Sequence, residues 1–370
     1  MSLAKKQVLI RPLWDLGLNN RLFDTIYPWS LTRWRKAAAD LGIALDSWDS
    51  MPLDKADCVW LMDLPDRKTE FLNAKKRARP GTPFVLQVME TPVGRPHNFM
   101  PANQALCDVL VTYQQGPLSH PNVVRYRLPH SLSASPASTP PRPFHERSCA
   151  IMVNSNRTEG FLATRKPGLV GLPGIGRNLS GWSMPWWSWV NPARGELYSW
   201  RRKLARTAEA KGPDLLSVVG PNWQGERISW FPLSNRRPYT CCISSSTNRK
   251  TEIISHYKFC VAVENYRGQM SYISEKIFDP IIAGSVPIYL GDENIAEVIP
   301  AGAFVDVRDF RDQRELLLYL ESCSESEWES MRSAGQAFVR TEVARTFSTE
   351  TFVATMNNLL QKLLTPHGPS

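Results

Sequence analysis

Short apolar runs alternate with amphipathic segments along most of the chain, which predicts strands that alternate with helices. Strands are expected at residues 8–10, 56–62, 83–89, 108–112, 148–153, 215–219, 257–263 and 286–290. Helices are expected at residues 31–41, 66–77, 195–211, 274–283, 311–321, 325–343 and 351–364. This alternation indicates α/β units built on parallel sheets.

A stretch rich in Ser, Pro and Ala, residues 131–143, separates two such sets of elements and is interpreted as a linker. We expect an N-terminal α/β domain over residues 1–143, which includes this linker, and a C-terminal α/β domain over residues 144–346. A final amphipathic helix and tail are expected over residues 347–370.

Two segments, residues 168–192 and 222–250, fit no regular element and are predicted to be long loops, which are often functional in compact domains. The first contains four tryptophans between residues 182 and 189. These rings could stack on sugars or lie at a membrane surface, although packing beneath a loop is the more common use.

Charge and composition narrow the classes of function. The 370 residues carry 44 Lys and Arg against 35 Asp and Glu, a net charge of +9 that favours nucleotide phosphates, nucleic acid or an anionic membrane face. Nucleic-acid binding is disfavoured because the basic residues are dispersed and no known motif occurs. No apolar run could span a membrane and no signal peptide is evident, so a cytoplasmic protein is expected. The six His and seven Cys lack metal-ligand spacing.

The densest chemical signal lies in residues 257–310. A buried strand runs into Glu264 and Asn265, and after a polar loop Ser274 can cap a helix that carries Lys276 in its first turn. The amino end of a helix offers free N–H groups to phosphate, and Lys276 adds a full positive charge there. This pattern alone also fits an ordinary strand–loop–helix with a surface ion pair.

The same segment resembles the donor-binding signature of the α1,3/4-fucosyltransferases, glycosyltransferase family 10. The residues that carry the resemblance are Phe259, Glu264, Asn265, Tyr272, Ile273, Ser274, Glu275, Lys276, Ala283, Gly284, Val286, Pro287, Ile288, Gly291 and Phe304–Phe310. One departure is Tyr266, where the family commonly has Ser. The resemblance implies a GT-B-like fold, in which two Rossmann-like α/β domains face each other across a cleft.

The resemblance also assigns roles in donor binding. Lys276 is implied to neutralise the diphosphate, Glu275 to bind the ribose hydroxyls, and Tyr272 and Asn265 to line the phosphates. Glu264 is implied to hydrogen-bond the fucose or to stabilise developing positive charge.

Two upstream segments extend the resemblance. A strand ending at Ser155 and Asn156 resembles the start of a donor-domain loop, and Arg194 resembles the arginine that grips the donor diphosphate. Residues 84–92 resemble the N-terminal strand that ends in the catalytic base, which would be Glu90 here.

The implied reaction is inverting transfer of L-fucose from GDP-fucose to a hydroxyl of a glycan or glycolipid acceptor, without a required metal or other cofactor. An α1,3-type linkage on a bacterial surface oligosaccharide such as lipopolysaccharide is expected, with peripheral contact at the anionic inner face of the membrane. A transferase for another GDP-sugar and an inactive nucleotide- or glycan-binding relative are the alternatives, because nothing in the motifs identifies the sugar uniquely.

Overall fold

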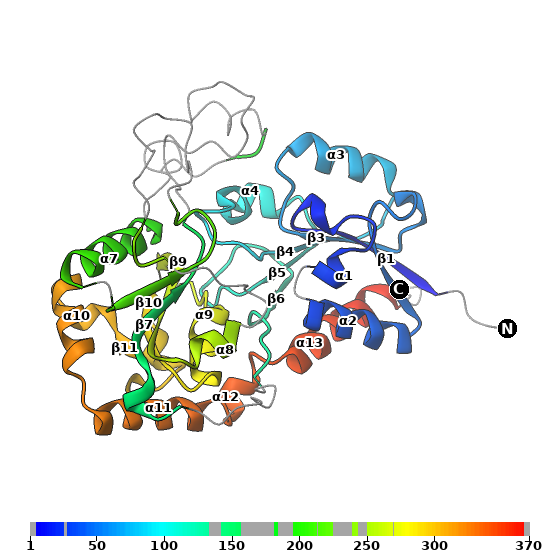
Figure 1. Cartoon of the computed structure of the whole chain (residues 1–370). Coiled ribbons are helices and arrows are strands. Elements are labelled where there is room, and N and C mark those ends of the chain that lie inside the picture. Colours follow the sequence, from blue (N-terminus) through cyan, green and yellow to red (C-terminus); the bar gives the residue numbers. More distant parts are fainter. Residues whose placement is uncertain are drawn as a thin grey trace. The chain divides into compact units, whose positions relative to one another are not determined.

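The computed structural model describes residues 5–25, 28–132, 142–156, 181–183, 195–212, 214–224, 239–242, 250–268 and 270–365. The chain forms two compact units, each an α/β domain with its own parallel sheet (Figure 1). Unit 1 comprises Met1–Ser131, Gly174–Val190 and Thr346–Ser370, and unit 2 comprises Leu132–Pro173 and Asn191–Arg345.

The sheet of unit 1 has the strand order β2-β1-β3-β4-β5-β6. Its strands are β1 (Lys6–Arg11), β2 (Ile43–Ser47), β3 (Cys58–Met62), β4 (Phe84–Gln87), β5 (Val109–Thr112) and β6 (Val123–Arg125). The sequence predicts four of them but misses β2 and β6. Strand β2 was missed because it carries Asp46, which is tolerated at this sheet edge because Arg35 pairs with its carboxylate at 2.6 Å.

The helices of unit 1 are α1 (Leu22–Thr25), α2 (Pro28–Asp40), α3 (Lys68–Arg77), α4 (Pro101–Gln104) and the chain's last helix, α13 (Thr349–Leu364). Figure 1 shows α13 beside α2. The Trp34 indole N–H donates to Asn357 Oδ1 at 3.1 Å, and the Trp34 ring packs edge-on against Phe352 and Trp60. The C-terminal helix is therefore part of the core of the N-terminal unit.

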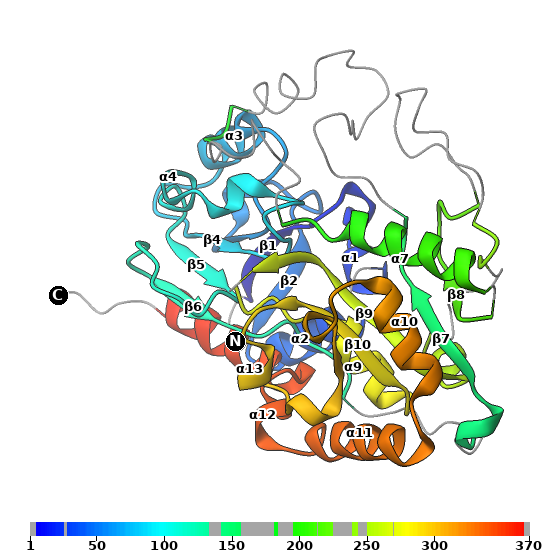
Figure 2. The same cartoon turned by 90° about the vertical axis from the view of Figure 1, so that its left-hand side faces the viewer.

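Unit 2 has the strand order β11-β10-β9-β7-β8. Its strands are β7 (Ser148–Val153), β8 (Leu216–Val219), β9 (Tyr257–Gly268), β10 (Val286–Asp292) and β11 (Val305–Asp306). Its helices are α7 (Tyr198–Lys211), α8 (Lys250–Ile254), α9 (Glu275–Ile282), α10 (Gln313–Ser322), α11 (Glu325–Phe338) and α12 (Glu342–Arg345). Figure 2 shows α9 close to β9 and β10, on which it packs.

The single helix predicted over residues 325–343 is wrong at its C-terminal end. Helix α11 ends at Phe338, and a separate short helix, α12, follows. The Thr341 hydroxyl donates to Phe338 O at 2.8 Å and accepts the Ala344 N–H at 3.2 Å, so this one side chain closes α11 and opens α12.

Candidate functional site

The strand that carries the donor motif is longer than predicted. Strand β9 continues to Gly268, so the residues directly after Asn265, which were expected in a polar loop, still belong to the strand. The polar end of the strand has its own partner, because Glu196 and Tyr266 form an antiparallel bridge. Gly195 makes this approach possible: its φ is +86°, and a Cβ there would lie 2.7 Å from the Tyr266 ring.

Three side chains of the motif form a buried ionic cluster. Glu264 is fully buried; its Oε1 accepts the Ser274 N–H at 2.8 Å and its Oε2 accepts the Ser274 hydroxyl at 2.7 Å. Lys276 Nζ lies 3.3 Å from Glu264 Oε2 and donates to Ser274 Oγ at 3.0 Å. Ser274 caps α9, as predicted. The cluster thereby fixes a cation at the amino end of α9, where anions are favoured.

Gly291 gives this carboxylate its space. A Cβ at Gly291 would lie 2.5 Å from Glu264 Cγ and 2.7 Å from the Tyr289 hydroxyl. No side chain fits at that distance, so only glycine lets β10 pass so close to Glu264. The glycine of the motif is therefore explained by the buried carboxylate beside it.

Asn265 is held by a residue that the sequence analysis missed. Arg201 on α7 is almost fully buried; it donates to Asn265 Oδ1 at 3.0 Å and also to the Val263 carbonyl. Burial lowers the pKa of Arg201 because it disfavours the charged form. Arg201 shares a helix face with Leu204, Ala205 and Ala208, all buried, and this spacing is the signal that could have identified it.

Glu275 lies at the edge of the cluster, with its carboxylate 3.6 Å from Lys276 Nζ and 3.9 Å from Lys250 Nζ. Lys250, which was not predicted, also pairs with Asp279 at 2.7 Å. Burial opposes the charge on Lys250, but Glu275 and Asp279 outweigh burial and raise its pKa. Tyr272 is buried in the loop that leads into α9. Glu275 is thus positioned between two lysines and is partly exposed.

Three upstream residues were also predicted to belong to the donor site, and the structure describes two of them, Ser155 and Asn156. Ser155 and Asn156 follow β7, which pairs with β9 in parallel, so both residues lie at the same sheet edge as the end of β9. Asn156 is buried, and its Nδ2 donates to Asn222 O at 2.9 Å. Arg194 lies outside the described residues.

In unit 1, Glu90 follows β4 at the carboxyl edge of the sheet. Its N–H donates to Asp63 Oδ2 at 3.1 Å, and its carbonyl accepts the Tyr113 hydroxyl at 3.0 Å. Asp63 also accepts the Met89 N–H at 2.6 Å. Asp63 is fully buried and has a φ of +63°, a value that is uncommon outside glycine. The backbone of Glu90 is therefore fixed by Asp63 and Tyr113, neither of which was predicted.

Burial raises the pKa of Asp63 to about 7, although Arg95 and the backbone N–H groups oppose the shift. The folded protein therefore keeps a proton on Asp63 that the unfolded chain has released above about pH 4. We expect this group to make the wild type less stable as the pH rises from about 4 to 7, by at most about 1.4 kcal/mol per pH unit.

The measurement is urea unfolding between about pH 5 and 8 for wild type, Asp63→Asn and the exposed control Asp40→Asn. The stability of wild type relative to Asp63→Asn should fall with increasing pH and level off above about 7. A difference independent of pH would contradict the raised pKa.

The tryptophan-rich segment is described only around Trp182. This indole is buried, donates to Pro65 O at 2.8 Å and stacks on His97 with ring centroids 5.8 Å apart. The prediction that such aromatic rings pack beneath a loop is confirmed for Trp182. Trp186, Trp187 and Trp189 lie outside the described residues.

Within the part of the chain that the structure describes, no three His, Cys, Asp or Glu side chains gather where they could hold a metal ion. Among the described helices, none combines the length and apolar character that crossing a bilayer requires.

Comparison with known proteins matches residues 235–333 to the model of glycosyltransferase family 10 (fucosyltransferase), C-terminal part. An α-(1,4)-fucosyltransferase of Arabidopsis thaliana is 36% identical over 87 residues, 22% of this chain and 21% of the relative. The 4-galactosyl-N-acetylglucosaminide 3-α-L-fucosyltransferase 9 of Mus musculus is 40% identical over 117 residues, 29% of this chain and 32% of the relative. The chain thus matches between about a fifth and a third of these relatives' lengths.

The whole chain is similar to a solved structure, the crystal structure of an α1,3-fucosyltransferase with GDP-fucose. The TM-score is 0.53 at 14% sequence identity, and the match covers 99% of this chain and 92% of the solved one. This likeness shows the fold: a GT-B-like architecture of two Rossmann-like α/β domains, as predicted. The predicted resemblance to the family 10 fucosyltransferases is likewise confirmed, and the Glu264–Ser274–Lys276 cluster lies inside the matched segment.

Proposed function

We propose that this protein, which resembles the family 10 fucosyltransferases, transfers L-fucose from GDP-fucose to a hydroxyl group of a glycan acceptor. The observation that carries the proposal is the buried cluster of Glu264, Ser274 and Lys276. It lies within the family match and fixes a lysine at the amino end of α9. A nucleoside diphosphate leaving group needs such fixed positive charge.

We assign the donor site to residues at the carboxyl edge of the unit 2 sheet. Lys276 and the amino end of α9 neutralise the charge that develops on GDP. Arg194, which lies outside the described residues, is proposed to share this role on the strength of the family resemblance alone. Tyr272 and Asn265 line the phosphates, with Ser155 and Asn156 on the neighbouring loop. Glu275, which is partly exposed, binds the ribose hydroxyls. Glu264 orients Ser274 and Lys276 and stabilises positive charge that develops on the fucose.

Glu90 is proposed as the general base that takes the proton from the attacking acceptor hydroxyl. A single displacement then inverts the configuration at the fucose carbon, and GDP departs. We propose that Lys276 and Arg194 supply the positive charge that a divalent ion supplies in other transferases, so that the reaction proceeds without a required metal.

Calorimetric titration tests the donor assignment directly. The protein is titrated with GDP, GDP-fucose, GDP-mannose and UDP-sugars, with and without EDTA. GDP and GDP-fucose should bind, UDP-sugars should not, and EDTA should have no effect. Preferred binding of GDP-mannose would indicate a transferase for another GDP-sugar, and absence of nucleotide binding would overturn the proposal.

The acceptor is proposed to be a bacterial surface oligosaccharide, fucosylated through an α1,3-type linkage at the cytoplasmic face of the inner membrane. The net charge of +9 supports contact with anionic lipids there. The mouse relative is named for a 4-galactosyl-N-acetylglucosaminide acceptor, which makes that disaccharide a suitable first probe.

A further inference from the structure

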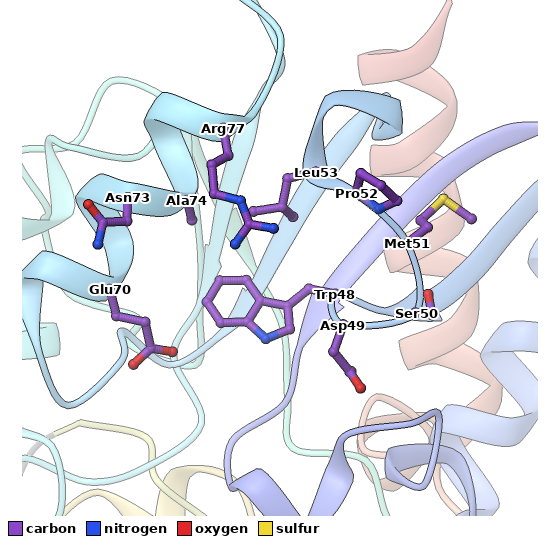
Figure 3. A pocket seen from close by; sticks show the side chains of 10 residues that line it. All are labelled: Trp48, Asp49, Ser50, Met51, Pro52, Leu53, Glu70, Asn73, Ala74 and Arg77. Carbon is purple, nitrogen blue, oxygen red and sulfur yellow. The ribbon is translucent and has the colours of Figure 1, made fainter.

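Unit 1 contains a cavity of about 710 Å³ that the donor and base assignments leave unused. We name it the Trp48 pocket (Figure 3). Its lining residues are Trp48, Asp49, Ser50, Met51, Pro52, Leu53, Glu70, Asn73, Ala74 and Arg77. Residues 48–53 form the connection that follows β2, and the others lie on α3. The volume falls within the range of small-molecule sites.

The pocket combines an aromatic ring with polar side chains around it. The Trp48 indole lies at the centre of the view in Figure 3, with Arg77, Glu70 and Asp49 around it. Trp48 is half-buried, whereas Asn73 and Arg77 are exposed on α3. A pyranose ring presents an apolar C–H surface and a rim of hydroxyls. An indole with carboxylate, amide and guanidinium groups beside it offers complementary contacts to both.

A buried arginine fixes the central ring and one of the carboxylates. The Arg11 guanidinium lies over the Trp48 ring, 5.8 Å from its centroid, and Arg11 Nε lies 3.2 Å from Glu70 Oε1. The Arg11 side chain is only 6% exposed. Trp48 and Glu70 are therefore held in place by the same cation, which lowers the entropic cost of ordering them around a ligand.

The strand register relates this pocket to Glu90. Ser47 pairs with Ile10, Arg11 with Leu61, and Met62 with Gln87, so the strands end at a common edge of the sheet. Trp48 follows β2 and Glu90 follows β4. In the order β2-β1-β3-β4 these strands are three spacings apart, roughly 14 Å. That distance is the span of a short oligosaccharide.

We propose that the Trp48 pocket is an acceptor subsite that binds a non-reacting pyranose unit of the glycan whose other end is fucosylated at Glu90. The sugar stacks on Trp48 and hydrogen-bonds to Glu70, Asn73 and Arg77. The link to fucosylation depends on the proposed function, whereas sugar binding in the pocket does not. The enzyme would then prefer acceptors long enough to reach both sites.

A glycan array probed with the full-length protein tests binding in the absence of activity. Wild type is compared with Trp48→Ala, with Asn73→Ala and with Trp14→Ala, a control at an exposed tryptophan of the same unit outside the pocket. We expect wild type to bind glycans of several units, Trp48→Ala and Asn73→Ala to weaken binding at least about tenfold, and Trp14→Ala to bind normally. Asn73 is exposed, so that variant keeps the test valid if Trp48→Ala fails to fold.

A transfer assay separates this proposal from the proposed function. Repeats of the 4-galactosyl-N-acetylglucosaminide disaccharide are compared with the single disaccharide. In Trp48→Ala the KM for the repeats should rise, while kcat and the KM for GDP-fucose should stay unchanged. Glycan binding that depends on Trp48, without any fucose transfer, would support the proposed sugar site and refute the proposed transferase activity. The proposed sugar site would be refuted if wild type bound no glycan on the array. It would also be refuted if wild type and both pocket variants had equal glycan binding or equal KM for the repeats.

Discussion

Replacing Glu90 by Gln is expected to reduce fucose transfer by about 10²- to 10⁴-fold while GDP binding stays nearly unchanged. Gln keeps the size and the backbone contacts of the residue, whose N–H donates to Asp63 and whose carbonyl accepts from Tyr113. It removes only the carboxylate that can accept a proton. The measurement is kcat for transfer from GDP-fucose together with the Kd for GDP from calorimetry.

Glu350→Gln is the matched control, because Glu350 is an exposed carboxylate of the same unit on α13. It should change neither transfer nor GDP affinity. If Glu90→Gln lost GDP binding as well, Glu90 would belong to the donor site or to the framework of unit 1. If Glu90→Gln kept normal turnover, another group would have to be the base.

The sequence predicts elements best where apolar runs are continuous and buried on both sides. Strands β3 and β10 are such runs, and the structure buries every residue in each. Strand β2 alternates buried and half-buried residues at a sheet edge and was missed. The end of β9 was missed because its pairing with residues near Gly195 comes from a segment distant in sequence.

The residues of the candidate site also differ in whether the sequence could identify them. Glu264, Glu275 and Lys276 were predicted because the continuous segment that carries them resembles the family 10 donor-binding signature. Asp63 and Lys250 were missed because their partners lie in segments distant in sequence, which no local pattern encodes. Arg201 was missed although its spacing with other buried residues on one helix face was a local signal.

Buried charge explains why the predicted residues of the motif are bonded to one another. A carboxylate as buried as Glu264 is stable only when a cation and hydrogen-bond donors surround it. Ser274 and Lys276 supply both. Residues that are proposed to bind the donor and are also ion-paired this closely stabilise the fold, so a single substitution is expected to change folding and function together.

The Lys276→Ala variant is accordingly expected to lose stability and activity at once. It leaves Glu264 buried without its cation, a change that typically costs about 3–5 kcal/mol. It also removes a group proposed to neutralise the leaving diphosphate, which should reduce turnover at least ~10²-fold. Thermal unfolding and kcat measured on this variant alone do not distinguish the two effects.

The double variant Glu264→Gln/Lys276→Met separates them, because it removes both charges and leaves no unpaired buried ion. We expect its unfolding temperature to return close to that of wild type, while kcat stays at least ~10²-fold down and GDP affinity stays weak. Lys211→Ala, at the far end of α7, serves as a control for removing a lysine from unit 2. Recovery of turnover along with stability in the double variant would show that Lys276 only neutralises Glu264. Stability that returns while turnover stays low would show that the two removed charges serve catalysis as well as folding. Weakened GDP affinity in the same variant would assign the diphosphate role to Lys276, because Glu264 is proposed to act on the fucose.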